Sequence, residues 1–246
     1  MSISDWRWEV QIQGNLSDLE HLARHCTFDY ASVFRDEQND SYLYYSKAFD
    51  VCETSEKVLV TADDELAVLS GVLKFVRDSH EPVLTGAVHK SHEDGRRDVF
   101  VHIRETLQLR AEIGEVTVTV TDAEGNLVQQ LTPPPRTVTI SELAIQDAAV
   151  TKAMRLFAAP DVKTWVGLYR LHEVIEADVG SERLLVWGSK NDLKRFKHSA
   201  NSIEVAGDAA RHGKENTQPP SNPMTIEEAI AYVNYVLHAW LTSKGG

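Results

Sequence analysis

Short runs of alternating apolar and polar residues mark the first half of the chain. Residues 6–14, WRWEVQIQG, alternate bulky and polar side chains and end at Gly14, which is the period of a half-buried strand. Residues 115–121 alternate cleanly, and the turn AEGN that follows predicts a hairpin returning through 127–131. Further strands are predicted at roughly 28–34, 41–48 and 83–90.

Helical spacing of apolar residues appears at two places in the same half. Ser17 and Glu20 have the spacing of a capping box and predict a short helix through about His25. From Thr54 to about Val76, apolar residues recur every three or four positions, which predicts a longer amphipathic helix. Strands and helices together predict an antiparallel α/β arrangement.

The segment TPPPR at 132–136 separates two kinds of periodicity. Three successive prolines cannot continue a helix or a sheet ladder, and they stiffen a connection. The apolar period is close to 2 just before this segment, at 115–121, and close to 3.6 after it. We therefore predict an α+β protein with an α/β domain at 1–131, a proline linker at 132–136 and a mostly helical domain at 137–246.

Capping residues divide the second half into helices. The apolar segment 181–189 fits either a helical turn or a buried connector, because periodicity does not separate the two. The predicted helices run from the capping box of Thr139 and Glu142 to about Phe157, from Asp161 to Gly180, from Ser189 or Asn191 to about Ala200, from the box of Asn201 and Glu204 to near Gly213, and from the box of Thr225 and Glu228 towards the C-terminus.

Composition indicates a globular protein without a membrane anchor. No apolar run approaches the roughly 20 residues of a membrane helix, and the first residues do not have the pattern of a signal peptide. We therefore expect a cytoplasmic protein. Its two cysteines, Cys26 and Cys52, lack metal-ligand spacing; free thiols fit an intracellular protein, and a disulfide between them stays open.

Charge is distributed unevenly along the chain. Residues 1–135 hold 12 basic and 24 acidic side chains, so they carry the whole net charge of −12. Residues 136–246 hold 13 of each. The acidic part should repel a nucleic-acid backbone, so an anion-binding surface is expected in the C-terminal part.

The stretch from Lys190 to Gly213 gathers the candidate functional residues. A basic helix face with a histidine suits a phosphate or an RNA backbone, because Lys and Arg supply charge and donors while His titrates near neutral pH. Lys194, His198 and Asn201 have the spacing of one helix face. The candidate catalytic residues are Arg195, His198, Arg211 and His212, and the candidate ligand-binding residues are Lys190, Lys194, Asn201 and Asp208.

A structural role for the same residues is equally compatible with the sequence. LKRFKH has the composition of an ordinary solvated helix face, and Asn201 would then be only an N-cap. Arg211 would pair with Asp208 or stabilise a helix C-terminus, where His212 is also favourable.

This stretch and the helices around it resemble the all-α HEPN-type domains of prokaryotic toxin and phage-defence systems. The resemblance covers about residues 138–243 and rests on helix order and on the polar segment ANS…GDAARHG. In that family an Arg and a His four to six residues apart cut RNA without a metal, often in a dimer. Here two residues separate Arg195 from His198, and Arg211 is adjacent to His212. The family spacing occurs only in RRDVFVH at 96–102, which is predicted to be a strand.

Two hypotheses follow from the sequence. In the first, a regulatory or defence-associated protein binds RNA or a nucleotide through its helical domain. RNA cleavage would then use His198 or His212 as general base and the arginines to stabilise the charged phosphate. In the second, a non-catalytic interaction protein offers its acidic domain to a protein partner and forms a homodimer through its helices. No metal or cofactor is expected, because His89, His92 and Glu93 are more typical of a surface turn than of a zinc site.

Overall fold

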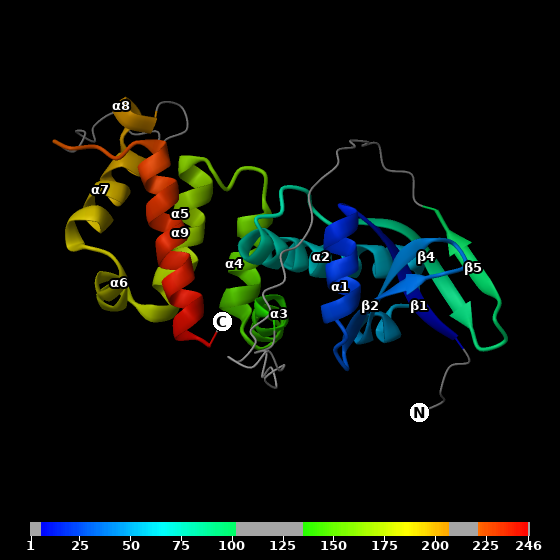
Figure 1. Cartoon of the computed structure of the whole chain (residues 1–246). Helices are drawn as coiled ribbons and strands as arrows, with labels where there is room; N and C mark the ends of the chain where they lie inside the picture. Colours follow the sequence, from blue (N-terminus) through cyan, green and yellow to red (C-terminus); the bar gives the residue numbers. More distant parts are fainter. Residues whose placement is uncertain (1–5, 102–134, 207–220, 246) are drawn as a thin grey trace, which may run out of the picture. The chain divides into compact units, whose positions relative to one another are not determined.

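The computed structural model of the chain describes residues 6–101, 135–206 and 221–245 (Figure 1). It confirms the α+β class, with an antiparallel sheet and its helices followed by a mostly helical region. The described residues form two compact units, one made of 6–66, 81–101 and 135–138 and the other of 67–80, 139–206 and 221–245. The predicted hairpin at 115–131 and the first three residues of the linker lie outside the described residues.

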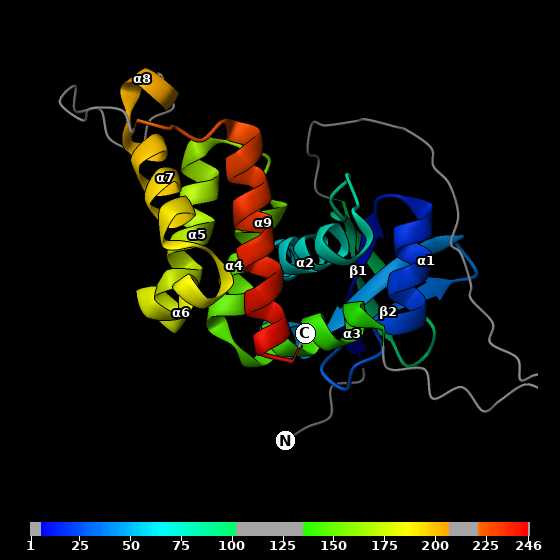
Figure 2. The ribbon, with the colours of Figure 1, turned by 60° about the vertical axis from the view of Figure 1, so that its left-hand side comes forward.

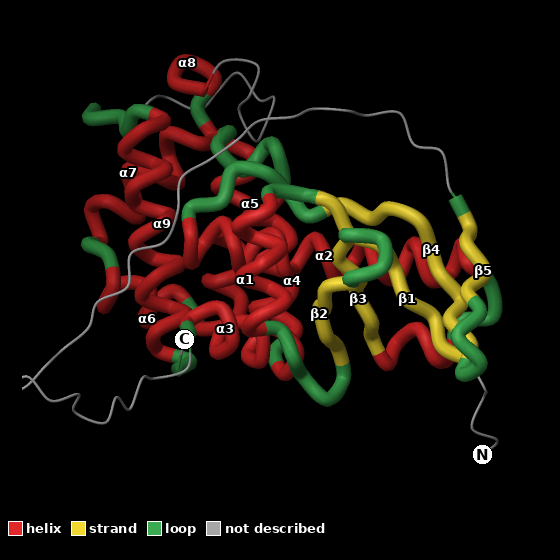
Figure 3. The backbone as a smooth tube through the Cα atoms, turned by 45° about the vertical axis from the view of Figure 1, so that its right-hand side comes forward, coloured by secondary structure: helices red, strands yellow, loops and turns green. Residues whose placement is uncertain are grey.

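A five-stranded sheet forms the centre of the first unit, and every neighbouring pair of its strands is antiparallel (Figure 3). The strands lie in the order β2-β3-β1-β4-β5, so β2 and β5 are its edges. The four strands predicted before residue 92 are confirmed, with small shifts at their ends. Their bounds are β1 Trp6–Gln13, β2 Ala31–Asp36, β3 Ser41–Ser46, β4 Leu84–His92 and β5 Arg97–Phe100.

Strand alternation gives the sheet two different faces. On one face Val10 lies opposite both Tyr44 and Val88, and all three are buried. Helix α2 (Ser55–Arg77) attaches to this face through Glu65, which accepts hydrogen bonds from the hydroxyls of Tyr44 at 2.8 Å and Ser46 at 3.0 Å. The other face carries the polar residues of β1 that alternate with this core.

Two short elements complete the first unit. Helix α1 (Leu16–His25) is capped by Asn15, whose side chain accepts from the backbone of Ser17; the predicted cap at Ser17 is therefore wrong by two residues. The 3-10 helix η1 (Lys47–Val51) leads to Cys52, whose carbonyl accepts from the indole of Trp8 at 3.0 Å. Cys26 and Cys52 are both buried free thiols.

The second unit is built from helices (Figure 2). Their buried side chains form one apolar core. Helix α5 lies beside α4, α7 and α9, and α5 and α9 together contribute about half of the buried core residues. The helix predicted up to the C-terminus is confirmed as α9, including its capping box of Thr225 and Glu228. The bounds are α3 Arg136–Gln146, α4 Ala148–Ala158, α5 Trp165–Val179, α6 Ser181–Trp187, α7 Lys190–Asn201, α8 Ile203–Ala206 and α9 Ile226–Ser243.

Four predicted helix boundaries in this unit are wrong, and the first is the cap at Thr139, which lies inside α3 because that helix already begins at Arg136. The single helix expected over 139–157 is two helices, because Asp147 leaves the helical conformation and its side chain caps α4. Thr164, rather than Asp161, caps α5 by accepting from Gly167 at 3.1 Å. Asn201 is the last residue of α7 instead of the cap of the next helix.

The C-terminal part of α2 packs within the second unit at a glycine. A Cβ atom at Gly71 would lie 2.1 Å from the carbonyl oxygen of Met154 on α4. Only a residue without a side chain allows two helix backbones to approach so closely. Val72 and Phe75, on the same part of α2, belong to the apolar core of this unit.

Candidate functional site

Helix α7 carries the predicted site, and local capping explains where it begins. The hydroxyl of Ser189, one of the two predicted caps, accepts a hydrogen bond from the backbone of Asp192 at 3.0 Å. Phe196 is fully buried on the inner side of α7 and packs against Tyr169 of α5 and Tyr232 of α9, with ring centroids 5.7 and 5.4 Å apart. This anchor determines which side of α7 faces solvent.

The solvent side of α7 presents Lys190, Lys194 and His198. Residues four positions apart lie on one side of a helix, and all three side chains are exposed. None of them has a hydrogen bond or an ion pair within the described residues. We call Lys190, Lys194 and His198 the α7 stripe.

Arg195, predicted to be catalytic, instead forms hydrogen bonds to the segment that leads into α9. Its Nε donates to the carbonyl of Asn222 at 3.0 Å, and its Nη2 donates to the carbonyl of Pro223 at 3.2 Å and to Glu228 at 3.0 Å. The side chain is only 16% exposed. The guanidinium therefore joins α7 to the segment that enters α9, and most of its donors are already satisfied.

A partly buried ion pair lies on the other flank of α7. Lys197 donates to both carboxylate oxygens of Glu176 on α5, at 2.6 and 2.7 Å. Burial raises the pKa of Glu176, but the hydrogen bonds from Lys197 and Ser181 outweigh it and leave that pKa below its ordinary value. The ion pair thus fixes the orientation of α7 on α5.

His172 lies next to this ion pair and has no exposed surface. Its Nδ1 is 3.8 Å from a carboxylate oxygen of Glu176, and neither ring nitrogen has a hydrogen-bond partner among the described residues. Burial lowers the pKa of His172 to about 4. Sequence analysis missed this group, although a His and a Glu four residues apart beside an apolar stripe were a usable signal.

The remaining predicted residues divide into described and undescribed ones. Asn201 belongs to the last turn of α7, where its amide donates to the carbonyl of Lys197 at 2.7 Å and its Oδ1 is buried without a partner among the described residues. Asp208, Arg211 and His212 lie outside the described residues. The structure therefore gathers Lys190, Lys194 and His198 on one surface. Arg195 differs from them because its guanidinium is bound to the segment that enters α9.

Comparison with known protein families, with characterised proteins and with solved structures finds no match. Over the described ranges, no three His, Cys, Asp or Glu side chains are placed to hold a metal ion. Among the helices in those ranges, none combines the length and apolar character needed to cross a membrane.

Proposed function

We propose that the helical unit binds RNA or a nucleotide and that the α7 stripe provides the contact with phosphate. The observation that carries this proposal is the contrast along α7. Arg195 and Lys197 are held in ion pairs that fix the helix, whereas Lys190, Lys194 and His198 are exposed and keep their donors available. Three cationic or titratable groups on one fixed helix face suit a phosphate backbone.

The HEPN resemblance leads us to propose a regulatory or defence role for this binding. Cleavage would place His198 or His212 as general base, with Arg195 and Arg211 stabilising the charged phosphate. Arg195 would first have to leave Asn222, Pro223 and Glu228, so its present contacts favour binding without cleavage.

The binding experiment titrates a single-stranded RNA and a mononucleotide with the full chain at several salt concentrations. Lys190→Gln/Lys194→Gln removes two charges from the α7 stripe, and Lys152→Gln/Arg155→Gln removes two exposed charges from α4 as the matched control. The slope of log affinity against log salt should fall by about 1.4 for RNA in the first variant, because each single-strand phosphate contact contributes roughly 0.7. An equal effect of both variants would reject the α7 stripe as the binding surface.

Cleavage is tested on the same RNA with and without EDTA. Metal-independent cleavage that disappears in His198→Gln, while binding and melting temperature persist, would establish the ribonuclease hypothesis. RNA that remains intact but bound supports the binding function as proposed.

The second candidate function is that of a non-catalytic interaction protein. The contacts of Arg195 favour it too, because a predicted catalytic residue instead joins α7 to the start of α9. Its acidic N-terminal part would contact a protein partner, and its helices would form a homodimer. Light scattering after gel filtration measures the oligomeric state. A dimer that binds neither RNA nor nucleotide would support this candidate over the first.

A further inference from the structure

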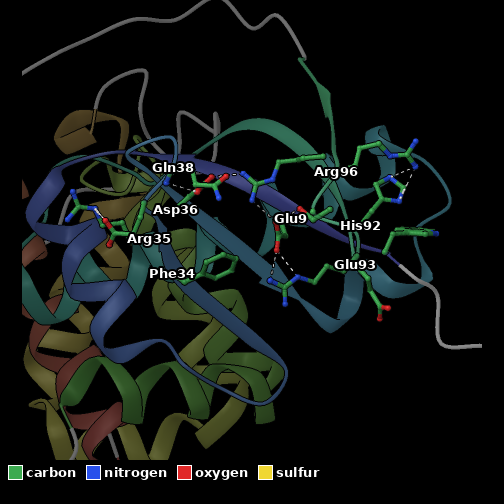
Figure 4. Close-up of a pocket in the computed structure, with 14 residues that line it drawn as sticks. Glu9, Phe34, Arg35, Asp36, Gln38, His92, Glu93 and Arg96 are labelled. Atoms are coloured by element: carbon green, nitrogen blue, oxygen red, sulfur yellow. Dashed lines mark hydrogen bonds and ion pairs between the residues drawn. The ribbon is translucent and has the colours of Figure 1, made fainter.

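We propose that the polar face of the sheet binds a small molecule through an oxyanion, either a phosphate or a carboxylate. A pocket of about 700 Å³ opens there, between β1, β2, β4, β5 and their turns (Figure 4). This volume is within the range of known small-molecule sites. All residues that line the pocket belong to the first unit, so the proposal is independent of RNA binding by the α7 stripe.

Two buried carboxylates form the floor of this pocket. The side chain of Glu9 is 2% exposed and accepts hydrogen bonds from Nε of Arg7 and from the hydroxyl of Ser91, each at 2.6 Å. The side chain of Asp36 is 8% exposed and accepts a hydrogen bond from Nη1 of Arg97 at 2.5 Å. These hydrogen bonds compensate the negative charge of the floor.

Solvent reaches the two arginines above these carboxylates. The side chain of Arg7 is 56% exposed and that of Arg97 is 27% exposed. The guanidinium of Arg7 lies over the rings of Phe34 and Tyr45, with centroids 5.6 and 5.7 Å away, so its plane is fixed. Its Nη1 has no hydrogen-bond partner in the part of the chain that the structure describes.

The rim of the pocket selects for a small anion over a polyanion. Arg96 is exposed, and its guanidinium adds a third cationic group at one side, with its Nη2 3.4 Å from a ring nitrogen of His92. Glu37 and Glu93 are exposed carboxylates on the rim, and the unit as a whole is acidic. A nucleic-acid backbone would meet these charges, whereas a single phosphate or carboxylate would reach the guanidinium groups inside.

Stability alone gives a poor reason for this arrangement. Removing a carboxylate from water costs free energy that ion pairing often fails to return, and apolar cross-strand pairs would hold a sheet face equally well. Glu9 and Asp36 instead fix two guanidinium groups in a defined orientation at a concave surface. Such preorganised donors lower the cost of binding an anion.

The test is calorimetric titration of the full chain with inorganic phosphate, phenyl phosphate and benzoate at constant ionic strength. Heat from both phosphates but not from benzoate identifies a phosphate site, and the reverse identifies a carboxylate site. Absence of saturable binding for all three at millimolar concentration would overturn the proposal.

Variants locate the binding. Arg96→Gln removes a rim charge that supports neither buried carboxylate, and Arg7→Lys keeps a charge beside Glu9 without the guanidinium fork. Each should weaken binding about tenfold, the effect of one charge-assisted hydrogen bond. Lys57→Gln, an exposed charge on α2 paired with Glu53, is the matched control and should leave the affinity unchanged. Equal affinity in wild type and in Arg96→Gln, or equal weakening by Lys57→Gln, would contradict the assignment even if Arg7→Lys folds poorly.

Discussion

The guanidinium of Arg195 on α7 lies 3.0 Å from the carboxylate of Glu228 in the first turn of α9. The same guanidinium donates to the backbone carbonyls of Asn222 and Pro223, just before that helix. Because Glu228 also completes the capping box of α9, one residue of α7 fixes the start of the last helix.

Replacing Arg195 with Met should therefore affect stability more than a surface substitution does. Loss of a charge-assisted hydrogen bond and two bonds to carbonyls predicts a decrease of about 1 to 3 kcal/mol in the free energy of unfolding. Lys194→Met, the exposed neighbour on the same helix, should change it by less than about 0.5 kcal/mol. Urea unfolding of both variants measures the difference. Equal stability would mean that the contacts of Arg195 contribute little, and its catalytic role would regain support.

His172 should make the protein sensitive to acid. Burial lowers its pKa from the ordinary value of 6.5 to about 4, so the unfolded chain takes up a proton at higher pH than the folded one. The stability that the neutral ring provides is complete above pH 6.5 and is lost as pH falls towards 4. The loss amounts to about 3 kcal/mol at most.

His172→Phe should remove this part of the acid sensitivity. The phenyl ring has no nitrogen to protonate, and both ring nitrogens of His172 lack hydrogen-bond partners among the described residues. Unfolding by urea at pH 7 and pH 5 should show a smaller loss of stability in the variant than in the wild type. Parallel losses would show that the carboxylate of Glu176, which faces the ring, compensates its protonation in spite of the nearby ammonium of Lys197.

Gly71→Ala should destabilise the second unit even though alanine is the better helix former. The substitution gains about 1 kcal/mol in helix propensity. The new Cβ would lie 2.1 Å from a backbone oxygen of Met154, so α2 or α4 must shift, and overpacking typically costs about 1 to 3 kcal/mol. Thermal melting should give a lower transition temperature for the variant. A higher one would mean that the two helix backbones separate without penalty.

Asp147 combines a helix cap with an ion pair, and two variants separate them. Its Oδ1 accepts from the backbone of Ala149 at 2.9 Å, while its Oδ2 lies 2.6 Å from the ammonium of Lys244. Asp147→Asn keeps the cap and should lose only a few tenths of a kcal/mol, as for most ion pairs near a surface. Asp147→Ala also removes the cap and should lose about 1 kcal/mol more. Equal stability of the two variants would show that the cap contributes nothing.

Local signals in the sequence predicted much of this fold. Ser189 and the box of Thr225 and Glu228 act within three or four residues, and the structure confirms both. Asp147 shows where such reasoning fails: apolar spacing continues across it, so the break depends on one side chain that competes for the backbone. Asn201 fails for a related reason, since its amide bonds backwards to Lys197 rather than forwards.

The candidate sites depended on information that lies further apart along the chain. Spacing on one helix was enough to predict that Lys194 and His198 share a face. The engagement of Arg195 needed the position of Glu228, 33 residues away. The sheet pocket was not predicted at all, because Arg97 meets Asp36 across 61 residues and only strand register brings them together.

The two buried thiols allow the opening rate of the first unit to be measured by chemical labelling. Burial raises the pKa of Cys26 to about 12, so almost no thiolate is available to an alkylating reagent while the unit stays closed. Both cysteines belong to this unit. The rate of thiol alkylation therefore reports how often the first unit opens. It needs no engineered label, and the helical unit contributes no thiol to the signal.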